Sequence, residues 1–161
     1  MLMLRGGPVM KMPGGANEWF GVFSDDRKKL VYGFNIQNSN TFQDGSHSVS
    51  FSPQLTYKPT NTLVLTVRPS YYTSYDELQY VSQASFNGQD RYLFASINQK
   101  TLSMSLRVNF NLSPDLTLQY WGQPFVSTGK YTDYKYITNP MADDYEERFM
   151  IYSPAQISYN P

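Results

Sequence analysis

The chain has 161 residues, enough for one domain, and a formal net charge of zero, which gives no indication of a polyanionic partner such as nucleic acid. It contains no cysteine, so disulfides, thiolate metal sites and cysteine nucleophiles are excluded together. Charged residues make up 16 % of the chain, below the roughly one quarter that is usual in soluble domains. The sequence contains no apolar run of the roughly 18 residues that would predict a transmembrane helix.

The first part of the chain predicts short strands. A weak strand is expected over residues 1–12, and the opening Met1–Gly6 is too short to be a secretory signal. The aromatic run Trp19–Phe23 predicts a second strand. Apolar and polar residues then alternate from Leu30 to Gln37, which predicts a half-buried third strand because strand side chains alternate with period two.

The middle and last parts of the chain continue this alternation. Strands are expected over Ser48–Lys58, Leu63–Val81, Arg91–Leu112 and Leu116–Tyr120, and no sustained helical period is present. Phase changes near Tyr72 and near Gln99–Lys100 predict β-bulges. We therefore divide the chain into antiparallel strands over residues 1–127 and an outer loop, or the start of further strands, over residues 128–161.

The predicted connections are of two kinds. Tight turns are expected at Ser24–Lys28, Pro59–Thr62 and Ser113–Asp115, where Asp, Asn, Ser and Pro are concentrated. Longer polar loops are expected at 38–45, 82–90 and after residue 127. Because outer-membrane barrels place short turns on the periplasmic side and long loops outside, the alternation puts Asp26, Asn61 and Pro114 on one rim and Asn40, Asn87 and Lys130 on the other.

The segment Thr101–Leu112 indicates what the apolar face contacts. Every even-numbered residue is apolar, and the opposite face carries mainly Ser, Thr and Asn where a strand facing water would more often carry Lys and Glu. At roughly 3.3 Å per residue and a tilt of about 40°, the apolar side spans the roughly 25 Å apolar band of an outer-membrane barrel. The predicted fold class is therefore all-β, an antiparallel up-and-down meander forming part of a transmembrane outer-membrane β-barrel.

Six strands and a weaker seventh fall short of the usual minimum of about eight, so the expectation is a fragment of a larger barrel. An open sheet would present unpaired backbone groups, which lipid does not tolerate. The expected partners are outer-membrane lipid and the remaining strands of the same barrel. A soluble β-sandwich is the competing interpretation, because alternation alone does not distinguish lipid from a protein core.

Two sets of residues are candidates for binding. Aromatic rings can stack on sugars, or they can form the interfacial girdle of a barrel. The ring candidates are Trp121, Phe125, Tyr131, Tyr134 and Tyr136. The polar-face candidates for the lumen are Gln54, Arg68, Arg107 and Asn109. The two arginines could select anions in a pore, but pairing within a packed lumen is the preferred interpretation because buried charges need partners.

The remaining chemical groups give weaker signals. The cluster Asp143, Asp144, Glu146 and Glu147 does not match a calcium-loop spacing and is interpreted as a solvated loop. Asp76 and Glu77 are adjacent in a strand, so they point to opposite faces and cannot act on one bond. His47 is expected to be solvated, and no serine elbow occurs. We expect no metal, no cofactor and no catalytic residue.

Several segments resemble a known family. They are Thr101–Lys130, Leu4–Pro8, Ser24–Lys29, Asp76–Val81 and Arg91–Ala95. They are similar to the C-terminal barrel of an uncharacterised Bacteroidetes-type outer-membrane family, whose members also carry an N-terminal domain like carbohydrate-binding module family nine. The likeness covers most of residues 1–137. The sugar-binding-like domain and the closing strands of that family have no counterpart here, which fits a fragment.

These observations lead to a functional expectation. The chain is predicted to be an outer-membrane β-barrel segment in the cell outer membrane, with a structural, transport or surface glycan-handling role and no catalytic site of its own. The alternatives are a carbohydrate-binding surface module, with polysaccharide as a further partner, or part of an outer-membrane glycan hydrolase.

Overall fold

The computed structural model describes residues 4, 7 and 9–157. The strands are β1 (Gly15–Phe23), β2 (Leu30–Thr41), β3 (His47–Tyr57), β4 (Leu63–Phe86), β5 (Gln89–Ser113), β6 (Leu116–Gly122), β7 (Phe125–Ile137) and β8 (Phe149–Ile151). Two short 3-10 turns, η1 (Glu146–Arg148) and η2 (Pro154–Gln156), flank β8. No helix in the described part of the chain is long and apolar enough to cross a membrane.

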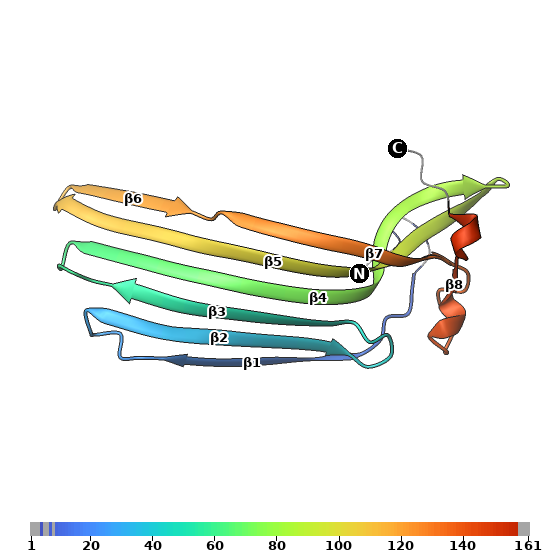
Figure 1. The fold of residues 1–161 in the computed structure, drawn as a ribbon, viewed down its shortest axis with the longest axis horizontal. Coiled ribbons are helices and arrows are strands. Elements are labelled where there is room, and N and C mark those ends of the chain that lie inside the picture. Colours follow the sequence, from blue (N-terminus) through green and yellow to red (C-terminus); the bar gives the residue numbers. More distant parts are fainter. Residues whose placement is uncertain (1–3, 5–6, 8, 158–161) are drawn as a thin grey trace.

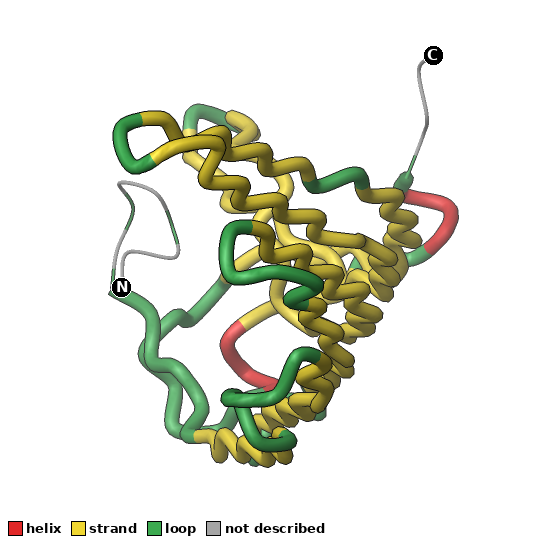
Figure 2. Tube along the Cα trace, turned by 90° about the vertical axis from the view of Figure 1, so that its left-hand side faces the viewer, coloured by secondary structure: helices red, strands yellow, loops and turns green. Residues whose placement is uncertain are grey.

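All eight strands form one antiparallel sheet (Figure 1). Its order is β1-β2-β3-β4-β5-β7-β8, with β6 also paired to β5, so each long strand lies beside the next one in the sequence. Viewed along the strands, the sheet is a single curved layer (Figure 2). The predicted all-β antiparallel meander is confirmed. Within the described residues, however, β1 does not pair with β6 or β7, so the sheet is not closed into a barrel.

Strands β6 and β7 act as one interrupted strand along β5. Leu106 pairs with Gly122, and Ser103 pairs with Phe125, so the register on β5 is the same before and after the break. The break falls at Gln123–Pro124, where proline lacks the backbone N–H that a ladder needs. The carbonyl of Pro124 still accepts a hydrogen bond from the Met104 N–H at 3.0 Å. The division expected after residue 127 therefore falls inside β7.

Two prolines face each other in the ladder between β3 and β4. The pairs Phe51–Tyr71 and Leu55–Val67 flank a gap in which Pro53 lies opposite Pro69. Side chains bridge this gap on the polar face, where the Ser52 and Ser70 hydroxyls lie 2.8 Å apart and Arg68 Nε donates to Gln54 Oε1 at 2.9 Å. The two backbone N–H groups that the prolines lack are thus missing at one place in the ladder. Side-chain hydrogen bonds hold β3 and β4 together there.

The predicted outer loops are shorter, or begin later, than expected. β2 continues to Thr41, and β4 and β5 continue to a two-residue turn at Asn87 and Gly88, with φ of 51° and 76°. Asn-Gly adopts positive φ at both central positions, so two residues suffice to reverse the chain. The three predicted tight turns do lie together at one end of the sheet, and the hairpin tip lies at the other (Figure 1).

The predicted bulges near Tyr72 and Gln99–Lys100 are wrong. Tyr72 pairs with Thr101 and Thr73 with Lys100 in an unbroken ladder. The register shifts lie further along, between Asp76 and Gln79 and between Tyr80 and Ser82, where β4 bends. The phase change in the sequence instead reflects a change from apolar to polar residues on the same face of the strand. Of the weak strand expected over residues 1–12, residues 1–3, 5–6 and 8 lie outside the described residues, and the rest are not in a strand.

A small apolar core lies at the hairpin end of the sheet. Its buried members are Leu4, Met10, Leu78, Phe94, Tyr145 and Phe149. It joins the N-terminal segment, the bent part of β4 and β5, and the segment around η1. The core therefore fixes this end of the molecule and does not extend along the sheet.

Candidate functional site

The register places the large apolar residues of the long strands on one face, which we call the apolar face. Cross-strand pairs such as Tyr57–Leu65, Leu65–Val108 and Val108–Tyr120 join β3, β4, β5 and β6 through it. Successive residues of a strand point to opposite faces of the sheet. One row of cross-strand pairs therefore determines which residues of every strand lie on the apolar face. Representative members are Phe20, Tyr32, Ile36, Phe51, Leu55, Val67, Leu102 and Leu106.

On β3 and over Thr101–Ser105 of β5, the apolar face is the more exposed of the two. On β3, Val49, Phe51, Leu55 and Tyr57 are 39–45 % exposed, whereas the small polar residues between them, from Ser48 to Thr56, are half-buried or buried. No second layer of described residues covers the apolar face along the sheet. This is the reverse of a water-soluble protein, which places its apolar side chains inside.

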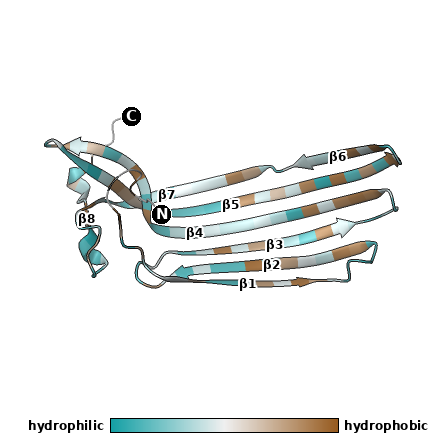
Figure 3. Cartoon of the chain, turned by 180° about the vertical axis from the view of Figure 1, so that it is seen from behind, coloured by the Kyte–Doolittle hydropathy of each residue, from teal (hydrophilic) through white to brown (hydrophobic). Residues whose placement is uncertain are grey.

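The apolar face ends at one level across the strands. Beyond Ile36 the same face continues with Asn38 and Asn40, and beyond Leu102 with Lys100 and Asn98. Figure 3 shows hydrophobic positions gathered towards the tight-turn end of the long strands and hydrophilic ones towards the hairpin end. From Leu102 to Leu112 the apolar side runs about 33 Å along β5 at roughly 3.3 Å per residue.

The opposite, polar face holds the four residues predicted to face a lumen. Gln54, Arg68, Arg107 and Asn109 all lie there, and the Gln54 amide oxygen accepts from Arg68. Arg107 pairs across the strands with Trp121 and helps to line an open depression of about 310 Å³ with Asn109 and Gln119. The structure therefore brings Gln54 and Arg68 together, and Arg107 and Asn109 together.

The five aromatic candidates do not form one platform. Trp121 and Phe125 lie on the polar face, opposite Arg107 and Ser103 of β5, whereas Tyr136 lies opposite Leu93. Fourteen residues of β5 separate Arg107 from Leu93, about 46 Å along the strand. Tyr136 stacks on Tyr152 with ring centroids 5.0 Å apart. Of the neighbours Tyr120 and Trp121, only Tyr120 shares the apolar face, and a girdle role stays a prediction.

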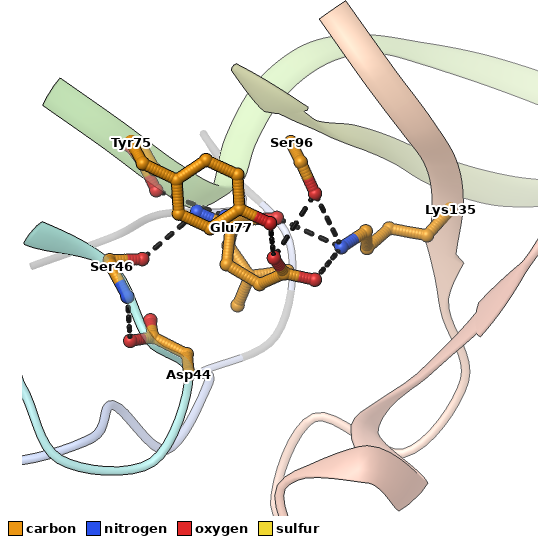
Figure 4. A network of polar contacts seen from close by, with 8 residues as sticks. Asp44, Ser46, Tyr75, Glu77, Ser96 and Lys135 are labelled. Atoms are coloured by element: carbon orange, nitrogen blue, oxygen red, sulfur yellow. Dashed lines mark hydrogen bonds and ion pairs between the residues drawn. The ribbon is translucent and has the colours of Figure 1, made fainter. Parts of the chain in front are cut away.

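Buried polar groups gather where β4 bends (Figure 4). The Lys135 Nζ, fully buried, donates to the Glu77 carboxylate, to the Glu77 carbonyl at 3.0 Å and to Ser96 Oγ at 3.1 Å. The other Glu77 oxygen accepts from the Tyr75 hydroxyl and from Ser96. We call Tyr75, Glu77, Ser96 and Lys135 the bend network. It ties β4, β5 and β7 together.

The network continues into the loop between β2 and β3. Glu77 N–H donates to Ser46 Oγ at 2.9 Å, and Ser46 N–H donates to Asp44 Oδ1 at 2.9 Å. His47 follows at the start of β3, where its Nδ1 lies 2.9 Å from the Gly45 carbonyl and its ring lies against Tyr75. The bend and the loop beside it are thus held as one unit.

Burial tends to raise the pKa of Glu77, but hydrogen bonds from Lys135 and Tyr75 outweigh it, and the pKa lies below its usual value. Burial and the hydrogen bond to Glu77 raise the pKa of the Tyr75 hydroxyl. All three Lys135 donors are used. The network therefore holds an ionised pair in a fixed arrangement and offers no free nucleophile or base.

A second buried cation anchors the C-terminal segment. Arg148 is fully buried and donates to the carbonyls of Ala142 at 2.9 Å, Asp143 at 3.0 Å and Lys11 at 3.1 Å. Lys11 Nζ in turn pairs with the Asp143 carboxylate at 2.6 Å. Arg148 thereby joins the segment before β1 to the segment before β8.

The acidic residues show no arrangement for chemistry. No group of three potential metal ligands occurs among the described residues. Asp143 is exposed, and its neighbours Glu146 and Glu147 lie in the turn η1. Asp76 accepts from the Leu78 N–H at 3.0 Å while Glu77 binds Lys135, so these adjacent carboxylates have separate partners.

Sequence reasoning missed the bend network and Arg148. Glu77 and Lys135 are separated by 58 residues, and their contact depends on the register shifts of β4 and β7. The one local signal in the sequence is a lysine within the tyrosine-rich stretch Tyr131–Tyr136.

Residues 4–148 match a protein family described as a domain of unknown function, DUF5916. Because this match covers most of the chain, the chain belongs to that family. No curated protein sequence and no solved structure matches the chain.

Proposed function

We propose that this chain forms part of a transmembrane β-barrel in the outer membrane, with the apolar face against lipid and the polar face towards the interior. The observation that carries the proposal is that no second layer of described residues covers the apolar face, and that on β3 and the middle of β5 its side chains are more exposed than the small polar residues between them. Lipid is the environment in which an exposed apolar sheet face is stable, and water is not.

The dimensions support this placement. The apolar side of β5 runs about 33 Å, which at a tilt of about 40° spans roughly 25 Å, the height of the apolar band of such barrels. The common level at which polar residues replace apolar ones then corresponds to the edge of the bilayer. The bend network lies beyond it, outside the membrane-spanning part of the strands.

The two unpaired edges of the sheet support the proposal that further strands complete the barrel. Unpaired strand edges are not tolerated in hydrocarbon, so β1 and the outer edge of β6 and β7 require partners there. We propose that additional strands pair with both edges and close the sheet. The role is structural or transport, with the projecting β4–β5 hairpin on the outer surface.

Cysteine labelling tests the facing directly, because the chain contains no cysteine of its own. Met104→Cys and Ser103→Cys lie on neighbouring positions of β5, on the apolar and polar faces respectively. A solvatochromic dye at residue 104 of the intact protein in phosphatidylcholine vesicles should be quenched by spin-labelled lipid. The dye at residue 103 should not. Equal quenching at both positions, or a monomeric protein that stays soluble without detergent, would contradict the proposal.

Orientation needs a second measurement. A membrane-impermeant maleimide added to whole cells should label Asn87→Cys at the hairpin tip and leave Asn61→Cys at the opposite end unlabelled. Labelling of residue 61 alone would reverse the proposed orientation while leaving the membrane placement intact.

A further inference from the structure

A pocket lies between the β4–β5 hairpin and the C-terminal segment, at the hairpin end of the sheet. It has a volume of about 400 Å³, within the roughly 300–1,000 Å³ typical of small-molecule sites. Its walls are mainly apolar and aromatic. They include Val81, Phe86, Phe94, Tyr134, Tyr152 and Ile157.

The charged side chains that line this pocket are all positive. Arg91 and Lys135 contribute to its lining, and no acidic side chain of a described residue does. The Lys135 ammonium is already committed to Glu77. Arg91 therefore supplies the positive charge that remains available.

The Arg91 guanidinium packs against two aromatic rings. Its central carbon lies 4.0 Å from the centroid of Phe86 and 4.6 Å from that of Tyr136. Among the described residues, the guanidinium makes no hydrogen bond or ion pair. Stacking on rings uses the flat face of a guanidinium and leaves its N–H donors, which lie in the plane, free for a planar acceptor.

We infer that this pocket binds a small amphipathic carboxylate, whose apolar body lies among the rings and whose carboxylate pairs with Arg91. Apolar walls with one positive group select such a ligand over a neutral or cationic one, because a carboxylate can accept two parallel N–H donors from arginine. The class of ligand does not depend on the proposed membrane placement, whereas the phase from which the ligand comes does.

The position favours a ligand from the water phase. Leu93, in the pocket wall, lies nine residues beyond Leu102, the last apolar residue of its face, which is about 30 Å along the strand. The pocket is therefore remote from the acyl chains that the apolar face is proposed to contact.

A matched set of three ligands tests the inference by calorimetry on the intact protein: 4-phenylbutyrate, 4-phenylbutanol and 4-phenylbutylamine. They share one apolar body and differ in the charge of the head group. The carboxylate should bind at least about tenfold more tightly than the alcohol, as expected for a charge-assisted hydrogen bond. The amine should bind most weakly.

Variants locate the effect. Arg91→Gln should abolish the preference for the carboxylate, Arg91→Lys should retain part of it, and Arg27→Gln, an exposed arginine at the tight-turn end of the sheet, should leave it unchanged. Val81→Trp should fill the pocket while keeping Arg91, and should therefore abolish binding of the carboxylate. This variant tests the inference if Arg91→Gln does not fold. Equal affinities for the three ligands, an unchanged preference in Arg91→Gln, or binding of a neutral oligosaccharide in place of the carboxylate would overturn the inference.

Discussion

The same two strands, β4 and β5, are built in different ways at their two ends. From Leu63 to Asp76, β4 pairs with β5 residue for residue, and its side chains alternate between an apolar and a polar face. Beyond Asp76 the register shifts twice, the strands bend, and charged groups are buried in the bend network. The regular part has no protein core of its own, whereas the bent part has one.

This difference separates two sources of stability. The regular part depends on ladder hydrogen bonds and on whatever contacts its apolar face. The bent part depends on a few buried contacts between segments that are distant in the sequence. Substitutions in the bent part should therefore act in any solvent, and those on the apolar face should act only where that face meets lipid.

The largest effect is expected from Lys135→Met. It leaves Glu77 partly buried without its cation, and removing one partner of a buried ion pair costs about 3–5 kcal/mol of unfolding free energy. Urea unfolding followed by tryptophan fluorescence measures the loss. Lys130→Met, an exposed lysine of the same strand, is the control and should cost little. A loss in Lys135→Met below about 1 kcal/mol, the scale of an exposed ion pair, would show that the network does not hold the bend.

The next effect tests the regular part. Leu106→Arg, near the middle of the apolar face, should cost about 2–4 kcal/mol in lipid, because in the proposed placement the charge would lie near the bilayer midplane. Asn109→Lys on the polar face should be mild. Refolding into vesicles at increasing urea measures both variants, and equal damage would mean that the faces are assigned wrongly.

A smaller effect is expected where two strands approach closely. A Cβ on Gly33 would collide with the Val22 carbonyl and the Phe23 ring, so Gly33→Ala should cost about 1–3 kcal/mol by overpacking. The matched control is Gly129→Ala, whose Cβ would lie 3.3 Å from Ile97 Cδ1, the flexible end of a side chain. Unfolding free energies that do not differ between the two variants would contradict the close approach of β1 and β2.

The smallest effect is a pH dependence of the bent part. The pKa of Glu77 is lower in the folded protein than its unfolded value of about 4.3, so its ionised form stabilises the fold above that pH. This contribution should disappear as the pH falls through the lowered pKa of the folded state. Unfolding free energies measured between about pH 3 and 6 should decline less steeply in Glu77→Gln than in the parent. Parallel curves would remove Glu77 from the acid response.

The sequence predicts the regular part well. Alternation in segments such as Thr101–Leu112 identifies the strands, their two faces and the residues that share each face, because these properties follow from a period of two. It places Gln54 and Arg68 on one face, where they are found to bond. Whether that face encloses a lumen stays a prediction, as do the outer membrane, lipid and polysaccharide as partners.

The bent part could not be predicted in the same way. The contact of Glu77 with Lys135 requires an extra residue in β4 and another in β7, and bulges have no fixed sequence signal. The hairpin was missed for a different reason. Polar residues at 82–90 suggested a loop, yet an exposed two-stranded ribbon can carry polar residues on both sides.

The length of the proline break between β6 and β7 determines which face of the sheet the following side chains occupy. Because the pairing with β5 is in phase on both sides of Pro124, the two residues of the break preserve the alternation of faces from β6 as far as Thr132, where β7 has a register shift of its own. Deleting Gln123 would shift this alternation by one residue, so the side chains from Phe125 to Thr132 would exchange the apolar face for the polar face. The length of this short interruption, more than its composition, therefore decides which face the first residues of β7 occupy.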